Sequence, residues 1–126
     1  MKITSVNVNG IRAAARKGFF DWLAREAPDV VCVQELKAHE HQLTDEVFRP
    51  QGYHVYYCCA EKPGYSGVAI YSKREPDEVQ VGLGDGWEDV DREGRYIEAR
   101  YDNPVVISLY MHSGSSSEDR QKLKYD

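Results

Sequence analysis

The fold is decided by residues 29–35, which read Asp29-Val30-Val31-Cys32-Val33-Gln34-Glu35. The four apolar residues in the middle predict a strand that is buried on both faces, as in a parallel or mixed sheet under helices. Ligands of open α/β sheets bind outside the carboxyl ends of the strands, so Glu35 is expected where a metal ion or substrate is met. The alternative, which the pattern alone favours, is a solvated glutamate at a strand end.

The segments before this strand predict a βαβ unit. Residues 2–8 form the expected first strand, and Asn9-Gly10 marks a turn after it. A helix is expected within residues 12–26, before the organising strand begins. Two strands joined in this way are parallel, with a right-handed crossover, so their carboxyl ends lie at the same edge of the sheet. We therefore expect Asn7 and Asn9 to lie close to Glu35.

The remainder of the chain predicts further strands and one hairpin. Residues 95–101 and 105–110 are expected to pair around Asp102-Asn103, which places Tyr110 opposite Arg95. The other expected elements are a polar loop with a short helix at 38–50, strands at 53–58 and 66–72 around a turn at 62–64, an acidic loop at 82–94 and a helix start at 117–120.

Composition indicates a soluble globular protein of one domain or less. The 126 residues are 41% apolar and 29% charged, which is enough to form a core. The sequence shows no signal peptide and no apolar run of about 18 residues, so we expect no membrane association. Three cysteines, two of them adjacent, fit neither a disulfide framework nor a zinc site, which favours a reducing cytoplasm.

Charge is unevenly distributed along the chain. The net charge is −5, but residues 1–37 hold six Lys and Arg against four Asp and Glu, a net charge of +2, which leaves −7 on residues 38–126. A local basic rim beside an acidic metal site is compatible with a phosphate substrate. The four histidines show no metal-ligand spacing and are expected at the surface: His39, His41, His54 and His112.

Several motifs in order resemble the exonuclease III family of apurinic/apyrimidinic endonucleases. They are Asn7-Val8-Asn9-Gly10-Ile11-Arg12-Ala13, Gln34-Glu35-Leu36-Lys37, Gly64-Tyr65-Ser66-Gly67-Val68-Ala69-Ile70, Glu93-Gly94-Arg95, and Tyr110 before a polar turn. The resemblance covers the whole chain but about the first half of the family's usual length. Together with a chain that ends inside its last helix, it predicts that residues 1–126 are the N-terminal half of a single nuclease domain.

The resemblance implies a fold, an activity and a set of site residues. The expected fold is half of a four-layer α/β sandwich of the DNase I-like type, with a mixed sheet and flanking helices. The expected activity is hydrolysis of DNA phosphodiesters at abasic sites and 3′ ends of double-stranded DNA, with Mg²⁺ or with Mn²⁺ in its place. The implied roles are a metal ligand (Glu35), an asparagine beside the metal (Asn7), a catalytic tyrosine on the scissile phosphate (Tyr110) and DNA-facing residues (Asn9, Arg12, Tyr65 and Arg95).

The sequence also departs from the family pattern. Leu36 replaces the usual threonine, and the family's later Gly-Asp-x-Asn and Ser-Asp-His motifs are absent. Residues 84–87 do not replace the first, because Trp87 stands where asparagine is needed, and His112 does not replace the missing histidine. One carboxylate and an amide make a poor Mg²⁺ site, so this chain alone is expected to bind Mg²⁺ weakly and to show little or no endonuclease activity.

Other interpretations remain open at this point. Asn7 has two possible roles, satisfying backbone groups at a strand end or orienting a neighbouring carboxylate. Tyr110 is either an ordinary strand aromatic or, with Arg95 opposite, half of a phosphate clamp. The chain as a whole is alternatively a phosphodiesterase of the same superfamily acting on lipid or inositol phosphates. A third interpretation is a non-catalytic half-domain that pairs with a second copy through its uncovered apolar faces.

Overall fold

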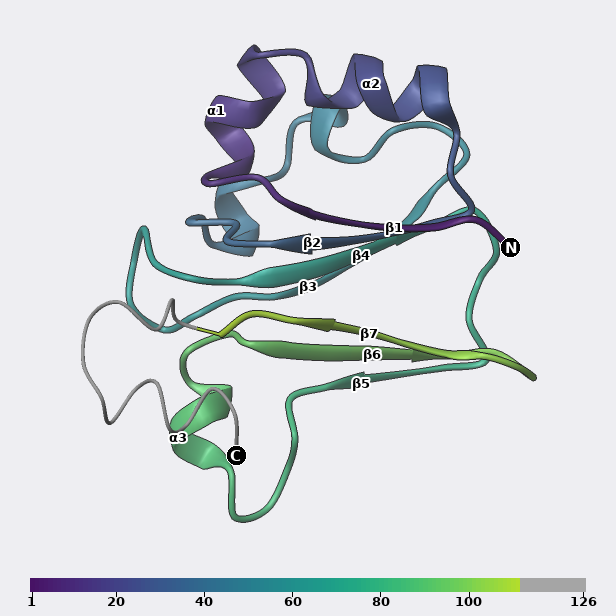
Figure 1. Ribbon diagram of the computed structural model, residues 1–126. Helices are drawn as coiled ribbons and strands as arrows, with labels where there is room; N and C mark the ends of the chain where they lie inside the picture. The colour runs from purple at the N-terminus through teal and green to yellow at the C-terminus, as the bar shows by residue number, and fades with distance from the viewer. Residues whose placement is uncertain (112–126) are drawn as a thin grey trace.

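The computed structural model describes residues 1–111, which form two packed β-sheets with helices over one of them (Figure 1). Sheet A has the order β1-β2-β4-β3 and sheet B the order β5-β6-β7. The strands of sheet A are β1 (Ile3–Asn7), β2 (Val30–Gln34), β3 (His54–Cys58) and β4 (Val68–Ser72). Those of sheet B are β5 (Glu78–Val81), β6 (Tyr96–Arg100) and β7 (Val105–Leu109). The expected helix start at 117–120 and His112 lie outside the described residues.

Two helices, α1 (Ile11–Arg16) and α2 (Phe19–Glu26), lie between β1 and β2 and cover sheet A. The helix expected within residues 12–26 is therefore divided: α2 lies inside that range, and α1 is a second helix that begins one residue before it. The chain turns at Gly18, whose φ of 99° lies in the left-handed region that glycine adopts without a steric penalty. Short helical turns complete the described structure: η1 (Glu40–Gln42), η2 (Glu46–Phe48) and α3 (Glu88–Asp91).

Strand β2 is the centre of the molecule, as its sequence predicts. It pairs in parallel with β1, Ile3 opposite Val30 and Asn7 opposite Gln34, and antiparallel with β4. Val31 and Val33 pack into the core under the helices, whereas Val30 and Cys32 pack into the core between the two sheets. Because both faces of β2 are covered, its position fixes the helix layer and sheet B together.

The predicted hairpin has the predicted register. Tyr96 lies opposite Leu109 and Arg100 opposite Val105, and the ladder continues with the Tyr110 N–H donating to the Arg95 carbonyl at 3.0 Å. The other partner of β6 is β5, an antiparallel strand in a stretch to which the sequence assigned no structure. Pairing on both sides makes β6 the central strand of sheet B.

The outer face of sheet B has no helix over it in the described part of the chain (Figure 1). Its strand β7 points three apolar side chains outward, with exposed fractions of 54% for Val105, 45% for Ile107 and 48% for Leu109. The architecture is thus one helix layer and two sheets, which confirms half of a four-layer sandwich. Within residues 1–111, no helix has the length and apolar character that crossing a membrane requires.

Gly94 is a position where the fold requires glycine. Its φ is 61°, and a Cβ there would lie 2.5 Å from the Ala60 nitrogen and 2.6 Å from the Cys59 carbonyl carbon. We predict that Gly94→Ala lowers the free energy of unfolding by about 1–3 kcal/mol more than Gly52→Ala, because both have positive φ but only Gly94 is crowded. Urea unfolding of both variants checks this, and equal losses would contradict it.

Candidate active site

Backbone hydrogen bonds join five chain segments at one end of the two sheets, on the left in Figure 1. The segment after β1 meets the segment after β2 through the Gly10 N–H and the Glu35 carbonyl (2.8 Å). The Lys37 N–H donates to the Ser66 carbonyl (2.8 Å), the Gly67 N–H to the Gly94 carbonyl (3.0 Å), and the Tyr110 N–H to the Arg95 carbonyl. The expectation that the ends of the first two strands meet is confirmed.

The backbone at this end is strained. Asn9, Glu35, Lys37 and Ser66 have φ values of 47°, 60°, 53° and 50°, in the left-handed region that residues with a Cβ rarely adopt. Among residues 1–111 only one other non-glycine residue has a positive φ, Ala27. Each such residue costs on the order of 1–3 kcal/mol, and strain of this kind concentrates at functional sites. The strain therefore marks this end of the sheets as the candidate site.

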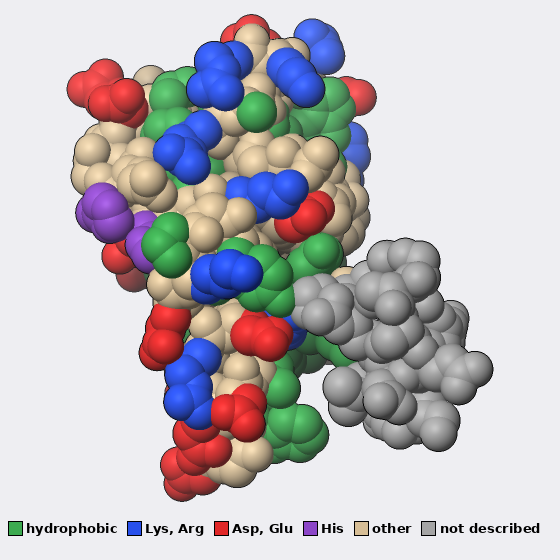
Figure 2. Space-filling view, turned by 90° about the vertical axis from the view of Figure 1, so that its left-hand side faces the viewer, with side chains coloured by type: hydrophobic (Ala, Val, Ile, Leu, Met, Phe, Trp, Pro, Cys, Tyr) green, Lys and Arg blue, Asp and Glu red, His purple; other side chains and the backbone are tan. Residues whose placement is uncertain are grey.

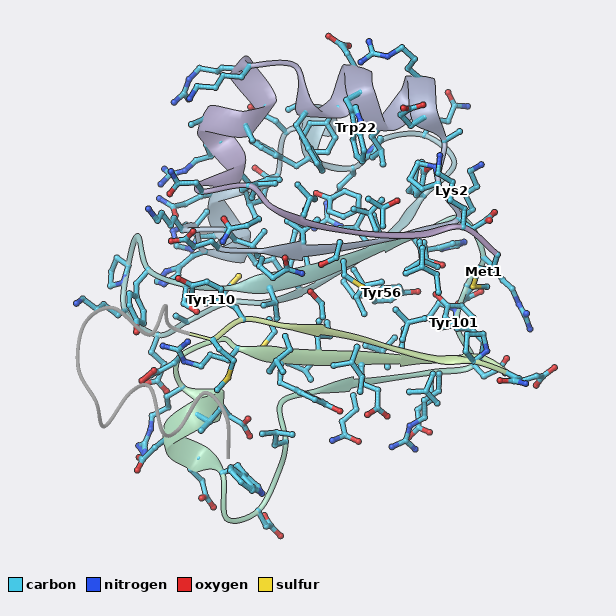
Figure 3. The ribbon with its side chains drawn as sticks, in the orientation of Figure 1. Met1, Lys2, Trp22, Tyr56, Tyr101 and Tyr110 are labelled. Carbon is cyan, nitrogen blue, oxygen red and sulfur yellow. The ribbon has the colours of Figure 1, made fainter. Side chains whose placement is uncertain are left out.

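Glu35 and Tyr110 meet at the site. The phenol of Tyr110 donates a hydrogen bond to the Glu35 carboxylate, and Figure 3 shows Tyr110 where β7 leaves sheet B. Burial raises the pKa of the Tyr110 phenol above its ordinary value, and the nearby Glu35 charge raises it further. Tyr110 therefore keeps its proton at neutral pH and is available as a hydrogen-bond donor.

The two asparagines organise the turn after β1. The Asn7 side-chain oxygen accepts from the Asn9 N–H at 2.9 Å, and the Asn9 side-chain oxygen accepts from the Lys37 ammonium at 2.7 Å. Asn7 is exposed and pairs in the ladder with Gln34, next to Glu35. Asn7 thus satisfies a backbone group, which is one of its two possible roles. It lies at the edge of sheet A where β1 and β2 end and Glu35 follows, here called the rim.

Lys37 belongs to the site, although no role was predicted for it from the sequence. Its ammonium lies 3.7 Å from the Glu35 carboxylate, and the two side chains are 41% and 20% exposed. The reason is the positive φ at Glu35 and at Lys37, which turns the chain back on itself after β2. A left-handed pair of non-glycine residues has no clear sequence signature, so the pattern did not predict this contact.

Arg95 lies opposite Tyr110, as predicted, but it is 5% exposed. Its guanidinium donates to the Glu93 carboxylate (2.9 Å), the Tyr65 hydroxyl (2.8 Å) and the Tyr110 carbonyl (3.1 Å). Glu93 lies inside one of the motifs that carry the resemblance, but no role was predicted for it. The structure brings these four residues together.

Arg12 lies beside a basic hollow at the same end. Its guanidinium donates to the Lys37 carbonyl at 3.2 Å, and the adjoining cavity of about 490 Å³ is lined by Asn9, Gly10, Arg12, Ala13, Arg16, Lys37 and Gly64. Figure 2 views this end of the molecule: Lys and Arg side chains gather over its upper part and Asp and Glu over its lower part. The uneven distribution of charge along the sequence therefore corresponds to a basic region and an acidic region at this end of the molecule.

The side chains at the site fit a loosely held Mg²⁺. Within the described residues no group of three or more His, Cys, Asp and Glu side chains could hold a metal ion. Glu35 offers a carboxylate, and Asn7, at the end of the neighbouring strand, has an amide oxygen that accepts from the Asn9 N–H. Mg²⁺ is commonly held by one or two carboxylates, with waters and substrate phosphates completing its shell.

A family model described as the endonuclease/exonuclease/phosphatase family matches residues 4–126. The exodeoxyribonuclease of Bacillus subtilis is 44% identical over 87% of this chain and 42% of its own length. The DNA repair nuclease APEX1 of Danio rerio is 41% identical over 91% of this chain and 37% of its own length. The chain thus spans less than half the length of these relatives.

Solved structures share the fold. An AP endonuclease from Archaeoglobus fulgidus superposes with a TM-score of 0.77 at 34% identity, covering 99% of this chain and 48% of that one. A 3′-5′ exonuclease from Neisseria meningitidis superposes with a TM-score of 0.78 at 30% identity, and the match covers 99% of this chain and 47% of that one. These similarities confirm the DNase I-like fold and the resemblance to exonuclease III-type AP endonucleases.

Lys37 is expected to weaken metal binding at Glu35, because its ammonium competes with the cation for the carboxylate. We predict that Lys37→Gln tightens Mg²⁺ binding about two- to fivefold, the size of an exposed ion-pair interaction. Mg²⁺ titration by calorimetry measures this, with competition by Mn²⁺ as an independent readout. The matched control is Lys73→Gln, since Lys73 binds the Ala27 carbonyl, before β2 begins. Weaker binding in Lys37→Gln would contradict the prediction.

Proposed function

The chain belongs to the endonuclease/exonuclease/phosphatase family, and on that premise we propose that it forms part of a DNA repair nuclease. The proposed reaction is Mg²⁺-dependent hydrolysis of phosphodiesters at abasic sites and 3′ ends of double-stranded DNA. The observation that carries the proposal is the contact between the Tyr110 phenol and the Glu35 carboxylate at the strained end of the sheets. The names of the Bacillus and Danio relatives support a nuclease that acts on DNA.

The residues at the rim divide the chemistry between them. Glu35 would hold Mg²⁺, with the Asn7 amide oxygen beside it, and a bound Mg²⁺ supplies Lewis-acid stabilisation of the phosphoryl group and the leaving oxygen. Tyr110 is protonated, and its single O–H, which donates to Glu35, would turn to a phosphate oxygen that enters the site. Its contact with Glu35 places this donor next to the carboxylate before substrate binds.

The basic hollow provides the surface for the DNA backbone. Arg12 is exposed at its edge, and Asn9 and Lys37 line it. Phosphate contacts fix the position of a protein on a duplex but carry no sequence information. Choice of an abasic site would then depend on the shape and deformability of the DNA. Tyr65, whose ring lies 5.2 Å from the Lys62 ammonium, is on the loop before β4 at the same end of the sheets.

Free thiols support a reducing compartment. The three cysteines, Cys32, Cys58 and Cys59, are unpaired, and burial raises the pKa of each thiol. Raised pKa values keep the thiols protonated and therefore less reactive toward oxidants. We propose the cytoplasm as the location of the protein on this basis.

Two alternatives are testable by simple experiments. Hydrolysis of a lipid or inositol phosphate in a substrate panel, without action on DNA, would favour another phosphodiesterase of the superfamily. A non-catalytic half-domain that pairs with a second copy is favoured by the exposed side chains Val105, Ile107 and Leu109. Sedimentation equilibrium tests that alternative: a dimer that Ile107→Lys dissociates would support it, and a monomer would exclude it.

A chimeric nuclease tests the proposed function directly. The matched region of the Bacillus exodeoxyribonuclease, 42% of that protein, is replaced by the corresponding residues of this chain. We predict Mg²⁺-dependent incision of an abasic duplex, lowered about 100-fold or more by Glu35→Gln and Tyr110→Phe, because each removes a group that acts on the transition state. The matched control is Tyr53→Phe, whose hydroxyl contacts the Pro28 carbonyl. A folded chimera without incision would contradict the proposal.

The chain of 126 residues is the second arm of this experiment. Its described residues bring one carboxylate to the rim, so we predict that the chain alone shows little or no incision of the same duplex. A clear Mg²⁺-dependent rate that Glu35→Ala abolishes would show that this prediction is wrong, while supporting the assignment of Glu35.

A further inference from the structure

Four side chains form a second group beside Glu35, here called the tyrosine–arginine cluster: Tyr65, Glu93, Arg95 and Tyr110. Arg95 is its centre, and its side chain is 6% exposed. The side chain of Glu93, by contrast, is 41% exposed. The cluster therefore has a buried cation with its counter-ion at the surface, which differs from a phosphate-binding arginine that extends from a surface.

The guanidinium contacts every other member of the cluster. It donates from Nε to the Glu93 carboxylate at 2.9 Å, with Nη2 at 2.8 Å from the same oxygen. Nη2 also donates to the Tyr65 hydroxyl at 2.8 Å, and Nη1 to the Tyr110 carbonyl at 3.1 Å. Its central carbon lies 5.9 Å from the centre of the Tyr65 ring and 5.5 Å from that of Tyr110. The planar fork of arginine makes such contacts in several directions at once.

The backbone places Arg95 between the segments that carry the two tyrosines. The Gly94 carbonyl, one residue earlier, accepts from the Gly67 N–H and from the Ser66 hydroxyl. The Arg95 carbonyl accepts from the Tyr110 N–H. Arg95 thus joins the loop before β4 to the end of β7, and its side chain repeats the connection that its backbone makes.

We propose that Arg95, held by Glu93, is a positioning residue that fixes Tyr65 and Tyr110 at the rim, and that DNA phosphate is not its ligand. The inference rests on the proposed nuclease function. A guanidinium already paired with a carboxylate adds little net charge for a phosphate, and its Nε, Nη1 and Nη2 each already donate to Glu93, Tyr110 or Tyr65. The sequence left open a phosphate clamp of Arg95 and Tyr110. In its place the proposal has an arginine that acts through two tyrosines, donating to the Tyr65 hydroxyl and to the Tyr110 carbonyl.

The first test measures the tyrosine rings in the full chain without DNA, by NMR with ¹³C-labelled tyrosine. Tyr65→Phe and Tyr110→Phe identify the two signals. We expect Glu93→Gln and Arg95→Lys to shift and broaden both, while the signals of Tyr53 and Tyr71 stay in place and show that the fold is retained. The matched control is Glu78→Gln, which removes the partner of the exposed Arg100. Unchanged signals of Tyr65 and Tyr110 in both variants would overturn the proposal.

The second test measures duplex binding as a function of salt concentration. A residue that neutralises one phosphate contributes about 0.9 to the slope of log K against log salt. We expect Arg12→Gln to lower the slope by about this amount and Arg95→Gln to leave it unchanged, because Arg95 neutralises Glu93 instead. A slope lowered equally by Arg95→Gln would overturn the proposal.

The two tests separate the two proposals. An unmutated protein that binds no abasic duplex at any salt concentration would contradict the proposed function, while the ring signals would still decide the role of Arg95. Where Arg95→Gln does not fold, Arg95→Lys is the variant for the binding test. It keeps the charge of the Arg95–Glu93 pair but loses the planar fork that contacts both tyrosines, so it is expected to weaken binding with the slope unchanged, and unweakened binding would overturn the positioning role.

Discussion

Parallel pairing of β1 with β2 is the constraint on which the rest of the structure depends. Parallel strands end at the same edge, so the segments that follow them meet there, with the Gly10 N–H donating to the Glu35 carbonyl. The pairing is stable because β2 is apolar on both faces and lies between the helices and sheet B. A buried strand thus determines where an acidic side chain emerges, and the hairpin of sheet B needs only the correct register to bring Tyr110 to it.

Those parts of the fold that follow from periodicity could be predicted from the sequence. The buried strand, its parallel partner and the hairpin register all depend on the alternation of side chains, which residue types report directly. The break between α1 and α2 could not, because one glycine in a helical pattern is compatible with a continuous helix and only the backbone at Gly18 decides. Strand β5 was missed although its four residues, Glu-Val-Gln-Val, alternate between polar and apolar, because so short a run becomes a strand through its pairing with β6.

The residues of the site likewise include some whose positions follow from the strands and others whose positions depend on the loops. The approach of Glu35 and Tyr110 was predictable, because each follows directly from a strand end. The environment of Arg95 was not, because it depends on three loops meeting, and sequence spacing reports neither burial nor the direction of a side chain in a loop. The strand register correctly predicted Arg95 opposite Tyr110. The register did not predict that Arg95 is buried and paired with Glu93, which changes its role at the site. The sequence pattern also missed Lys37. It stands in a polar loop after β2, yet its ammonium lies beside the Glu35 carboxylate.

Strain and packing are linked at this end of the molecule. Four residues with left-handed backbone, Asn9, Glu35, Lys37 and Ser66, are each disfavoured by on the order of 1–3 kcal/mol, and they persist only where the surroundings over-determine them. Here the surroundings are hydrogen bonds between loops and the fully buried Leu36, whose Cβ lies 3.1 Å from where a Cβ on Gly67 would be. Leu36 is thus an apolar anchor that holds the turn between Glu35 and Lys37. The rim is therefore rigid because its central residue belongs to the core, which keeps the carboxylate and the phenol in place before any ligand arrives.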